Sequence, residues 1–353
     1  MTTSGTISET VFRTNRVIDR AFGRCKIPQQ KITAELIQTA KDNLYLMLSN
    51  LSMKGVQLWC IEKLIIGTYE NKAMLTLPDG TYDLIGEPNY RTTSRLEGTN
   101  TSSAGGTVAN AFDDDFDTAC TQTSTNGNIS TEFDEDTLVT TVGILPNTSA
   151  TWSLVFERSD DGVTWTTAYT VGAQAYVNSE WSWFDIDGNL EATYFRVRET
   201  AGGTLNVREI YWGNTPQEIE MGRLNKDSYT TLPNKTFSGK PVQFWFDQQR
   251  DNPVLHMWPV TALTNRYDQI IVWRQRYIQD VGTLTETLDV PQKWFEPIIA
   301  GLAARIAAES AEVPDQREAM LKMEAASALA EVQGAERDNS PFTITPMIGG
   351  YTR

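Results

Sequence analysis

The chain of 353 residues contains one histidine, His256, and three cysteines, Cys25, Cys60 and Cys120. A single histidine excludes a zinc site built from several histidines, and a Ser-His-Asp triad would have to use His256. The cysteines lie far apart and form no Cys-x-x-Cys pair, so neither a disulfide framework nor a thiolate metal site is expected. The composition therefore indicates folding in a reducing compartment.

Long apolar runs and catalytic motifs are also missing from the sequence. The longest membrane-like stretch, Ile298 to Ala308, is interrupted by Arg305 and is far shorter than the roughly 20 residues of a spanning helix. The first residues show no basic-then-apolar signal pattern. No Gly-rich phosphate loop, Gly-x-Ser-x-Gly motif or metal-ligand spacing occurs. We therefore expect a protein that is not an enzyme, has no membrane contact and is assembled in a cytoplasm.

Lysine is absent from one long segment of the chain. Residues 99–214 hold 17 acidic residues, four arginines and no lysine, a net charge of −13 out of −15 for the whole chain. A linker rich in Gly, Ser and Thr precedes the segment, and Gly213-Asn-Thr-Pro216, which is typical of a turn, closes it. We predict that residues 99–214 are a domain inserted into a loop of a host domain. The negative charge also disfavours bulk binding of nucleic acid.

The host sequence on both sides of the insert has helical periodicity. Apolar residues from Leu36 to Leu51 recur at three- and four-residue steps, and a second apolar helix is expected from Val56 to Gly67. Pro291 suits the first turn of a helix running through Ile306, and Pro314 the start of another. The predicted parts are an N-terminal helical part (1–98), the insert (99–214), a hairpin with C-terminal helices (215–340) and a C-terminal docking tail (341–353).

Strand patterns occur inside the insert and after it. Trp152, Leu154 and Phe156 alternate with other residues, and turn signals recur every 8–15 residues, which is typical of a β-sandwich. After the insert, Asp251-Asn-Pro253 separates two apolar strands of a predicted hairpin. Residues 267–277 are expected to form a further strand. Its Arg274 and Arg276 line either an exposed face with salt bridges or a subunit contact. The predicted fold class is α+β and multidomain, an α-helical bundle with a β-hairpin and an inserted all-β sandwich.

The insert resembles the galactose-binding-like or discoidin-type jelly roll. Three motifs in order carry the resemblance: Asn110-Ala-Phe-Asp-Asp-Asp-Phe-Asp-Thr118, Gly127-Asn-Ile-Ser-Thr-Glu-Phe133 and Ser159-Asp-Asp-Gly-Val-Thr-Trp165. The family often holds a structural calcium, which implies Asp113, Thr118 and Glu209 as ligands here. Asp114 replaces the glycine that is usual in this family. The alternative is a solvated acidic turn without a metal.

The same resemblance implies a glycan site with aromatic side chains. Trp181, Trp183 and Phe184 lie in one short stretch and are the expected platform for a sugar ring. Aromatic residues two apart on a strand can equally form one face of a core. The chain would then be a carbohydrate-binding protein whose sandwich recognises glycans, which is the alternative to the function considered next.

The host sequence resembles the head-to-tail adaptor proteins of short-tailed bacteriophages, the tail tubular protein A type. The resemblance rests on the order of four segments, none diagnostic alone: 234–260, 271–280, 289–302 and 336–341. It implies a virion structural protein at the head-tail neck, with DNA sliding through the lumen of a twelvefold homo-oligomeric ring. The implied partners are the portal protein, the tail nozzle or tail tube protein, and tail fibres or capsid through the insert.

Two further segments are candidate contact sites. The apolar tail after Pro341 is expected to dock on portal or on a neighbouring copy through Phe342, Ile344, Ile348 and Tyr351. A basic stretch is either a patch for an acidic partner or DNA phosphate, or the polar face of an ordinary helix. Its residues are Arg13, Arg16, Arg20, Arg24 and Lys26. His256 lies between apolar residues of a predicted strand and is expected to be structural.

Overall fold

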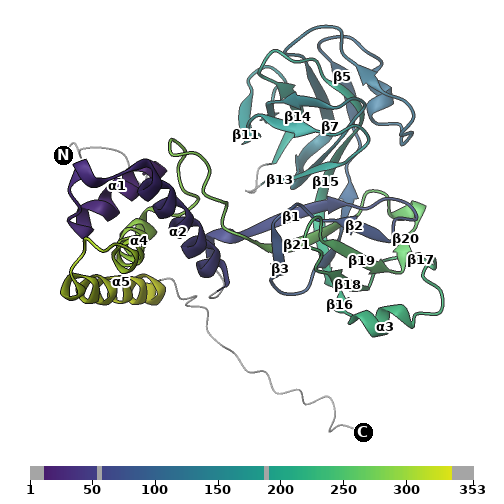
Figure 1. Cartoon of the computed structure of the whole chain (residues 1–353). Coiled ribbons are helices and arrows are strands. Elements are labelled where there is room, and N and C mark those ends of the chain that lie inside the picture. The colour runs from purple at the N-terminus through teal and green to yellow at the C-terminus, as the bar shows by residue number, and fades with distance from the viewer. Residues whose placement is uncertain (1–11, 54–57, 187–190, 336–353) are drawn as a thin grey trace. The chain divides into compact units, whose positions relative to one another are not determined.

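The computed structural model describes residues 12–53, 58–186 and 191–335 of the chain. The chain divides into two compact units (Figure 1). The first, here called the helical unit, comprises residues 1–61 and 276–353, and the second, the strand unit, comprises residues 62–275. In the described ranges, no helix is both long enough and apolar enough to cross a membrane.

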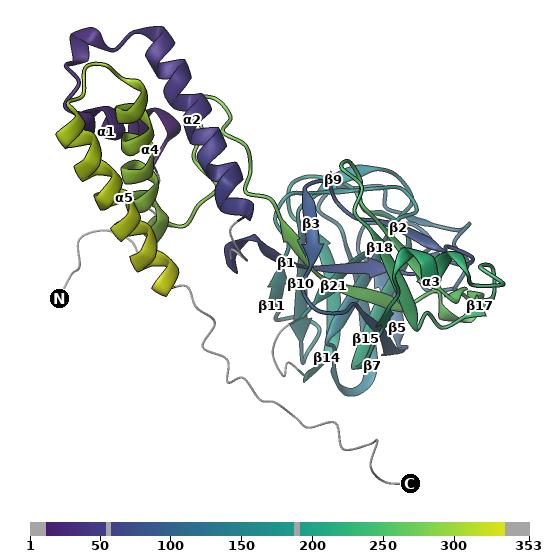
Figure 2. The ribbon, with the colours of Figure 1, turned by 60° about the horizontal axis from the view of Figure 1, so that its bottom comes forward.

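The described part of the helical unit has four α-helices, whose apolar side chains share one core. Figure 2 shows α1, α2, α4 and α5 beside one another. Helix α4 packs against the other three, because its sequence is apolar on nearly every side. Helix α1 is amphipathic: Val17, Ile18, Ala21 and Phe22 are buried, and its basic residues lie on the opposite face. The helices are α1 (Thr14–Cys25), α2 (Ala34–Met53), α4 (Phe295–Glu309) and α5 (Asp315–Ala335), with 3-10 turns at Gln29–Lys31, Leu58–Cys60 and Gln292–Trp294.

The expected second helix is wrong, whereas the other three helices of the prediction are present. Residues Ile61–Gly67 form strand β1, which lies beside β21 in a sheet. A short apolar run fits both the helical period of about 3.6 residues and the strand period of about 2 residues. The β-branched isoleucines 61, 65 and 66 favour the strand. Helix α4 also begins later than expected, at Phe295, because a 3-10 turn follows Pro291. The predicted helical part therefore ends near residue 53 rather than at residue 98.

The β-sandwich predicted for the insert is present. The five-stranded antiparallel sheet β11-β10-β14-β7-β5 packs on strands β8 and β13 and the first half of β15, and side chains from both layers share one apolar core. The strands are β5 (Thr99–Ser102), β6 (Cys120–Thr121), β7 (Asn128–Leu138), β8 (Thr141–Pro146), β9 (Ala150–Trp152), β10 (Leu154–Ser159), β11 (Thr166–Thr170), β12 (Gln174–Tyr176), β13 (Ser182–Asp185), β14 (Glu191–Glu199) and β15 (Asn206–Glu220).

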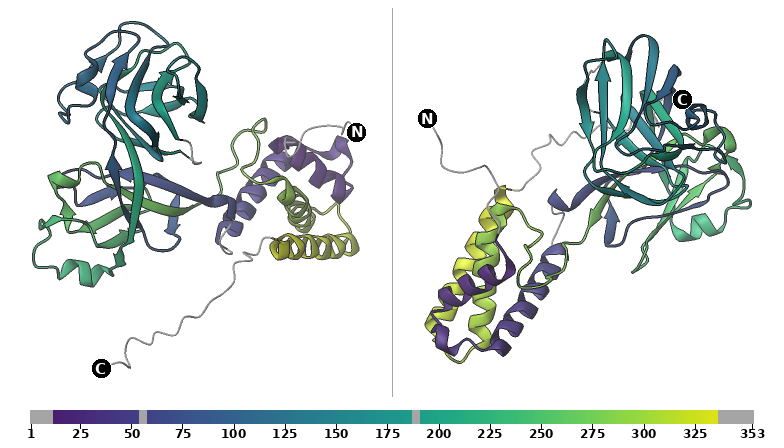
Figure 3. Two further views of the ribbon diagram at one scale, coloured as in Figure 1. Left: turned by 180° about the vertical axis from the view of Figure 1, so that it is seen from behind. Right: turned by 90° about the horizontal axis from the view of Figure 1, so that it is seen from above.

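Strand β15 continues from the sandwich into the rest of the strand unit, here called the carrier (Figure 3). Its residues 207–213 pair with β8, and residues 213–220 pair with β4, with an irregularity between Asn214 and Gln217. The predicted end of the insert at residue 214 lies inside this strand. The sandwich and the carrier therefore share an eight-stranded sheet, although each keeps its own main apolar cluster.

The carrier contains the predicted β-hairpin. Strands β18 and β19 pair antiparallel, with Phe244 opposite Met257. His256 stacks on Trp245 with ring centroids 4.5 Å apart, and burial lowers its pKa, which agrees with a structural role. The carrier elements are β1 (Ile61–Gly67), β2 (Met74–Thr76), β3 (Thr81–Leu84), β4 (Asn89–Arg95), β16 (Gly222–Arg223), α3 (Lys226–Thr230), β17 (Ser238–Gly239), β18 (Gln243–Asp247), β19 (Val254–Trp258), β20 (Val260–Thr261) and β21 (Gln269–Arg276).

Both arginines of the last strand have partners within their own unit. Arg274 Nη2 lies 2.7 Å from Glu62 Oε2, and Arg276 forms an ion pair with Asp289. Both guanidinium groups are mostly buried. The salt bridges agree with that part of the first interpretation, but the expected exposed face is wrong, because both arginine side chains are largely buried.

Candidate functional site

The acidic loop of the sandwich, residues 112–118, gathers oxygen atoms around the hydroxyl group of Thr118. Thr118 Oγ1 lies 3.1 and 2.9 Å from the carboxylate oxygens of Asp113, 3.1 Å from the Asp115 carbonyl oxygen and 3.4 Å from the Asn110 carbonyl oxygen. A threonine hydroxyl has one hydrogen and can donate it to only one of these acceptors at a time. Asp113 Oδ1 also accepts a hydrogen bond from the Asp115 amide at 3.0 Å, and oxygen atoms gathered in this way are ligands that a hard cation prefers.

Glu209 on β15, the third expected ligand, is completely buried. Its Oε2 accepts a hydrogen bond from Arg95 Nη2 at 3.4 Å, whereas Oε1 has no hydrogen-bond partner among the described residues. Burial raises the pKa of Glu209 to about 7; the charge of Arg95 opposes this rise, and the charge of Asp113 adds to it. A buried carboxylate oxygen without a partner is costly, so this position favours either a proton or a cation.

Asp114 has a backbone conformation that usually requires glycine. Its φ of +63° lies in the left-handed region that favours glycine. Its carboxylate bonds to Arg95 and to the Tyr267 hydroxyl, and Arg266 Nη2 lies 3.6 Å away. All three partners lie outside residues 99–214, so Asp114 ties the acidic loop to the carrier. Sequence reasoning missed Arg95 and Arg266, because residues that meet only through the tertiary fold leave no local pattern.

The oxygen atoms of this loop fit calcium in their chemistry. Calcium binds carboxylate, hydroxyl and carbonyl oxygens, and all three kinds are present around Thr118. No group of three or more His, Cys, Asp or Glu side chains within residues 12–53, 58–186 and 191–335 is arranged for a metal. Arg95 Nη2 also donates to the Phe112 carbonyl oxygen at 3.3 Å, so a guanidinium group already balances part of the negative charge. The calcium site stays a prediction.

We expect calcium to raise the free energy of unfolding of the full chain by about 2.7 kcal/mol at a hundred times its Kd. Asp113→Asn should reduce this increase, because it removes the charge from the two oxygens beside Thr118. Asp117→Asn is the matched control, since it lies in the same loop with a fully exposed side chain. Calorimetric unfolding with calcium and with chelator measures the difference. An equal calcium response in the wild type and in Asp113→Asn would contradict the site.

The expected sugar platform is wrong, because all three of its aromatic residues are buried. Trp181, Trp183 and Phe184 are 7%, 6% and 8% exposed. The indole rings of Trp181 and Trp183 stack with centroids 4.9 Å apart and pack with Tyr211 and other aromatic residues where the sandwich meets the carrier. Phe184 belongs to the core of the sandwich. The alternative interpretation, a core face, is therefore correct, and these rings cannot stack on a sugar.

A polar pocket of about 210 Å³ opens at the Ser159–Thr166 turn, one of the three motifs of the jelly-roll resemblance. Asp161 builds the turn by accepting hydrogen bonds from the amides of Val163 and Thr164, and these bonds lower its pKa to about 2. The lining residues are Arg158, Ser159, Asp160, Asp161, Thr164 and Thr166. Sequence reasoning used this motif to identify the fold and did not recognise it as a pocket.

The basic stretch lies on the polar face of α1. Arg13, Arg16, Arg20 and Lys26 are exposed, and Arg24 Nη2 pairs with Glu296 Oε1 at 2.5 Å. This placement agrees with the interpretation of an ordinary amphipathic helix, and a role in binding an acidic partner remains untested. The four apolar residues expected to dock on portal or a neighbouring copy lie outside the described residues; they are Phe342, Ile344, Ile348 and Tyr351.

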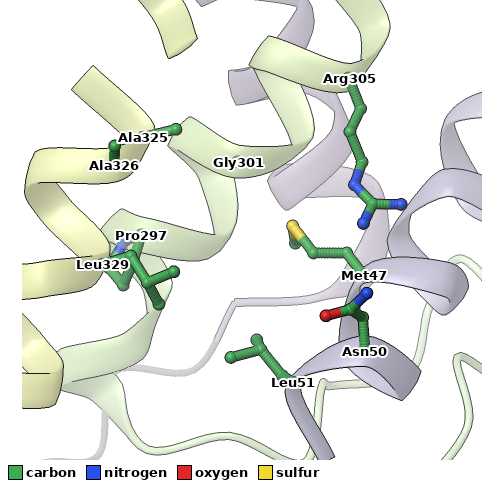
Figure 4. A pocket seen from close by; sticks show the side chains of 9 residues that line it. All are labelled: Met47, Asn50, Leu51, Pro297, Gly301, Arg305, Ala325, Ala326 and Leu329. Atoms are coloured by element: carbon green, nitrogen blue, oxygen red, sulfur yellow. The ribbon is translucent and has the colours of Figure 1, made fainter. Parts of the chain in front are cut away.

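A groove of about 190 Å³ opens between α2, α4 and α5 (Figure 4). Its lining is mainly apolar and includes Met47, Leu51, Ala325 and Leu329, with Asn50 and Arg305 as the polar members. Gly301 lies on the α4 side, where a Cβ atom would stand 2.8 Å from the Met47 sulfur. The groove therefore depends on small residues of α4 and α5.

No protein-family model matches the sequence, and no curated protein sequence matches it. Solved structures that match include three carbohydrate-binding modules. A Clostridium perfringens module in complex with GalNAc-beta-1,3-galactose is 14% identical, covers 32% of this chain and 93% of that chain, and has a TM-score of 0.29. Chitosan-binding module 1 from a chitosanase/glucanase of Paenibacillus sp. IK-5 is 22% identical, with coverages of 33% and 96% and a TM-score of 0.29. A family 32 module from C. perfringens NanJ in complex with galactose is 16% identical, with coverages of 36% and 99% and a TM-score of 0.28.

Proposed function

We propose that the inserted β-sandwich binds a carbohydrate and that the rest of the chain is the support to which the sandwich is attached. The observation that supports this proposal is the pocket at the Ser159–Thr166 turn, whose lining is entirely polar or charged. The Asp160 carboxylate and the Thr166 hydroxyl are exposed and have no hydrogen-bond or ion-pair partner in the described part of the chain. These two groups are available to a ligand.

The pocket contains the hydrogen-bond donors and acceptors that the hydroxyl groups of a sugar ring need. Arg158 supplies N–H donors, Asp160 supplies acceptor oxygens, and the hydroxyls of Thr164 and Thr166 can donate and accept. Neighbouring hydroxyls of a pyranose need both kinds of partner at short range. A volume of about 210 Å³ lies below the usual range for drug-sized ligands, so one monosaccharide unit is the expected occupant.

A glycan array probed with the full chain, followed by calorimetric titration of the best ligand, tests the proposal. We expect Asp160→Asn and Thr166→Val each to weaken binding by about tenfold or more, because each removes a hydrogen bond to the ligand. Asp134→Asn is the matched control, since it changes an exposed carboxylate on β7 of the same sandwich. Absence of binding to every glycan would reject the proposal, and binding unaffected by both pocket variants would place the sugar elsewhere.

A second candidate function is that of a virion structural protein, as the adaptor resemblance implies. The observation that favours it is the apolar surface of the helical unit. Tyr45 and Leu46 on α2 are 44% and 55% exposed, and Met320 and Met323 on α5 are 49% and 74% exposed. Such side chains suit contacts between copies of the chain. A closed ring with portal and tail nozzle as neighbours, with the sandwich pointing outward, would use contacts of this kind.

Mass photometry of the full chain, alone and mixed with portal protein, tests the assembly. We expect a large oligomer that Leu46→Asp reduces to smaller species, because a buried charge would oppose the contact. A chain that stays monomeric at all concentrations and forms no complex with portal would reject the second candidate. A glycan-binding monomer would leave the first proposal standing alone.

A further inference from the structure

We infer that the groove between α2, α4 and α5 is the docking site of the segment that follows α5 in the same chain, residues 341–351. This segment reads Pro-Phe-Thr-Ile-Thr-Pro-Met-Ile-Gly-Gly-Tyr and contains no charged residue. It lies outside the described residues, and only five residues separate α5 from its start. The inference rests on the groove, the composition of the segment and the length of the connection, and it is independent of the proposed function.

The groove and the segment are chemically complementary. Met47 and Leu51 line one wall and Leu329 the other, and the small residues Gly301 and Ala326 leave space between them (Figure 4). Phe342 and Ile344 are two residues apart, so in an extended backbone their side chains point to the same side. Pro341 and Pro346 disfavour a helix in this segment. An extended strand with two apolar side chains on one side is the shape that a narrow apolar groove accepts.

The connection is short enough for docking within one chain. Leu329 lies six residues before the end of α5, about 9 Å along the helix axis. The linker Glu336-Arg-Asp-Asn-Ser340 spans at most about 18 Å when extended, so the segment can return to the groove beside it. A short flexible linker gives an effective concentration in the millimolar range, which exceeds the concentration of any neighbouring copy at micromolar protein. The linker is also polar and suited to water.

Amide hydrogen exchange on the full chain tests the inference, read in peptides covering 297–305 and 321–329. We expect exchange there to be about tenfold faster in the double variant Phe342→Ser with Ile344→Ser than in the wild type, because undocking leaves the groove open. Thr343→Ser is the matched control in the tail and should leave exchange unchanged. Peptides from α1 report whether the helical unit stays folded. Equal protection in the wild type and the double variant overturns the inference.

A variant in the groove gives the reciprocal test. Ala326→Glu places a charge among the lining residues and should speed exchange in the 297–305 peptide as the tail variant does. Ser327→Glu is its control, because Ser327 is exposed on the same helix and does not line the groove. The protection of the wild type should be the same at about 1 and about 50 µM chain, as expected for an intramolecular contact. Protection that appears only at the higher concentration would assign the groove to the tail of a neighbouring copy and overturn docking within one chain.

Discussion

Replacing Arg91 with alanine lowers the free energy of unfolding of the strand unit by about 3 kcal/mol at pH 7, the low end of the cost of removing one partner of a buried ion pair. The Arg91 side chain, on β4, is 3% exposed, and its Nη2 lies 2.7 Å from Asp185 Oδ1. Its Nε donates to Gln269 Oε1 at 2.8 Å. Alanine leaves the buried Gln269 oxygen without this donor, and it leaves the partly buried Asp185 with Lys63 as its remaining ion-pair partner. Chemical denaturation of the full chain, followed by tryptophan fluorescence, measures the loss.

The cost of Arg91→Ala should depend on pH. Burial by itself would raise the pKa of Asp185, but hydrogen bonds from Arg91 and Lys63 outweigh it and hold the pKa below its ordinary value. A lowered pKa in the folded state stabilises the fold above the unfolded pKa of about 3.9, and this stabilisation is lost as the pH falls through the folded value. The difference between the wild type and the variant should therefore shrink below about pH 4.

Arg223→Ala is the matched control for this prediction. Arg223 pairs with Asp83 at 3.7 Å in the same unit, but its side chain is 44% exposed. An exposed pair contributes about 0–1 kcal/mol, so this variant should be close to the wild type at every pH. Similar losses in the two variants would show that burial of Arg91 does not determine its contribution.

The attachment of the sandwich to its carrier follows from the charge imbalance of the chain. The insert carries a net charge of −13, and its acidic residues meet cations of the carrier at two places. Asp185 pairs with Lys63 and Arg91, and Asp114 pairs with Arg95 and Arg266. The positive partners lie on either side of the insert in the sequence. Cationic side chains of the carrier therefore neutralise part of the negative charge of the insert.

The local patterns of the sequence were sufficient for elements whose residues decide their own conformation. The period of α2, the hairpin around Asp251-Asn-Pro253 and the alternation in the sandwich depend on neighbours in sequence, and all three are present. The strand Ile61–Gly67 was not predicted, because its apolar residues fit both periods and its conformation depends on pairing with β21, about 200 residues later. The continuity of β15 across the predicted boundary is a tertiary feature of the same kind.

Among the site residues too, those close together in sequence were predicted and those brought together by the tertiary fold were not. Asp113 and Thr118 lie five residues apart in one loop, so the motif was enough to bring them together. Arg95 and Arg266 complete that loop from outside the insert and could not be found from any motif. The aromatic stretch was misassigned, because a sequence does not state which face of a strand is covered by another domain. In the structure Trp181 and Trp183 face the carrier residues Ile65 and Tyr69.

Replacing Trp183 with alanine lowers the free energy of unfolding by about 3–5 kcal/mol, the range for loss of a buried tryptophan. Trp183 lies opposite Gly143 in the pairing of β13 with β8, and a Cβ atom at position 143 would stand 2.6 Å from the indole ring. A Cβ atom at Gly67 on β1 would stand 2.9 Å from its Nε1. The ring therefore fills the space between two glycine backbones, and its removal leaves a cavity that neither strand can close.

The Trp183 variant also separates a core role from a glycan role. We expect Trp183→Phe to lose less stability than alanine, because a smaller aromatic ring still fills part of the space. This variant should keep any affinity for glycan, since Trp183 is 6% exposed and is not among the residues that line the pocket at Ser159–Thr166. Val177→Ala, at a side chain that is 48% exposed and outside the pocket turn, is the control for a surface change. Full stability of Trp183→Ala together with loss of glycan binding would reverse the assignment of Trp183 to the core.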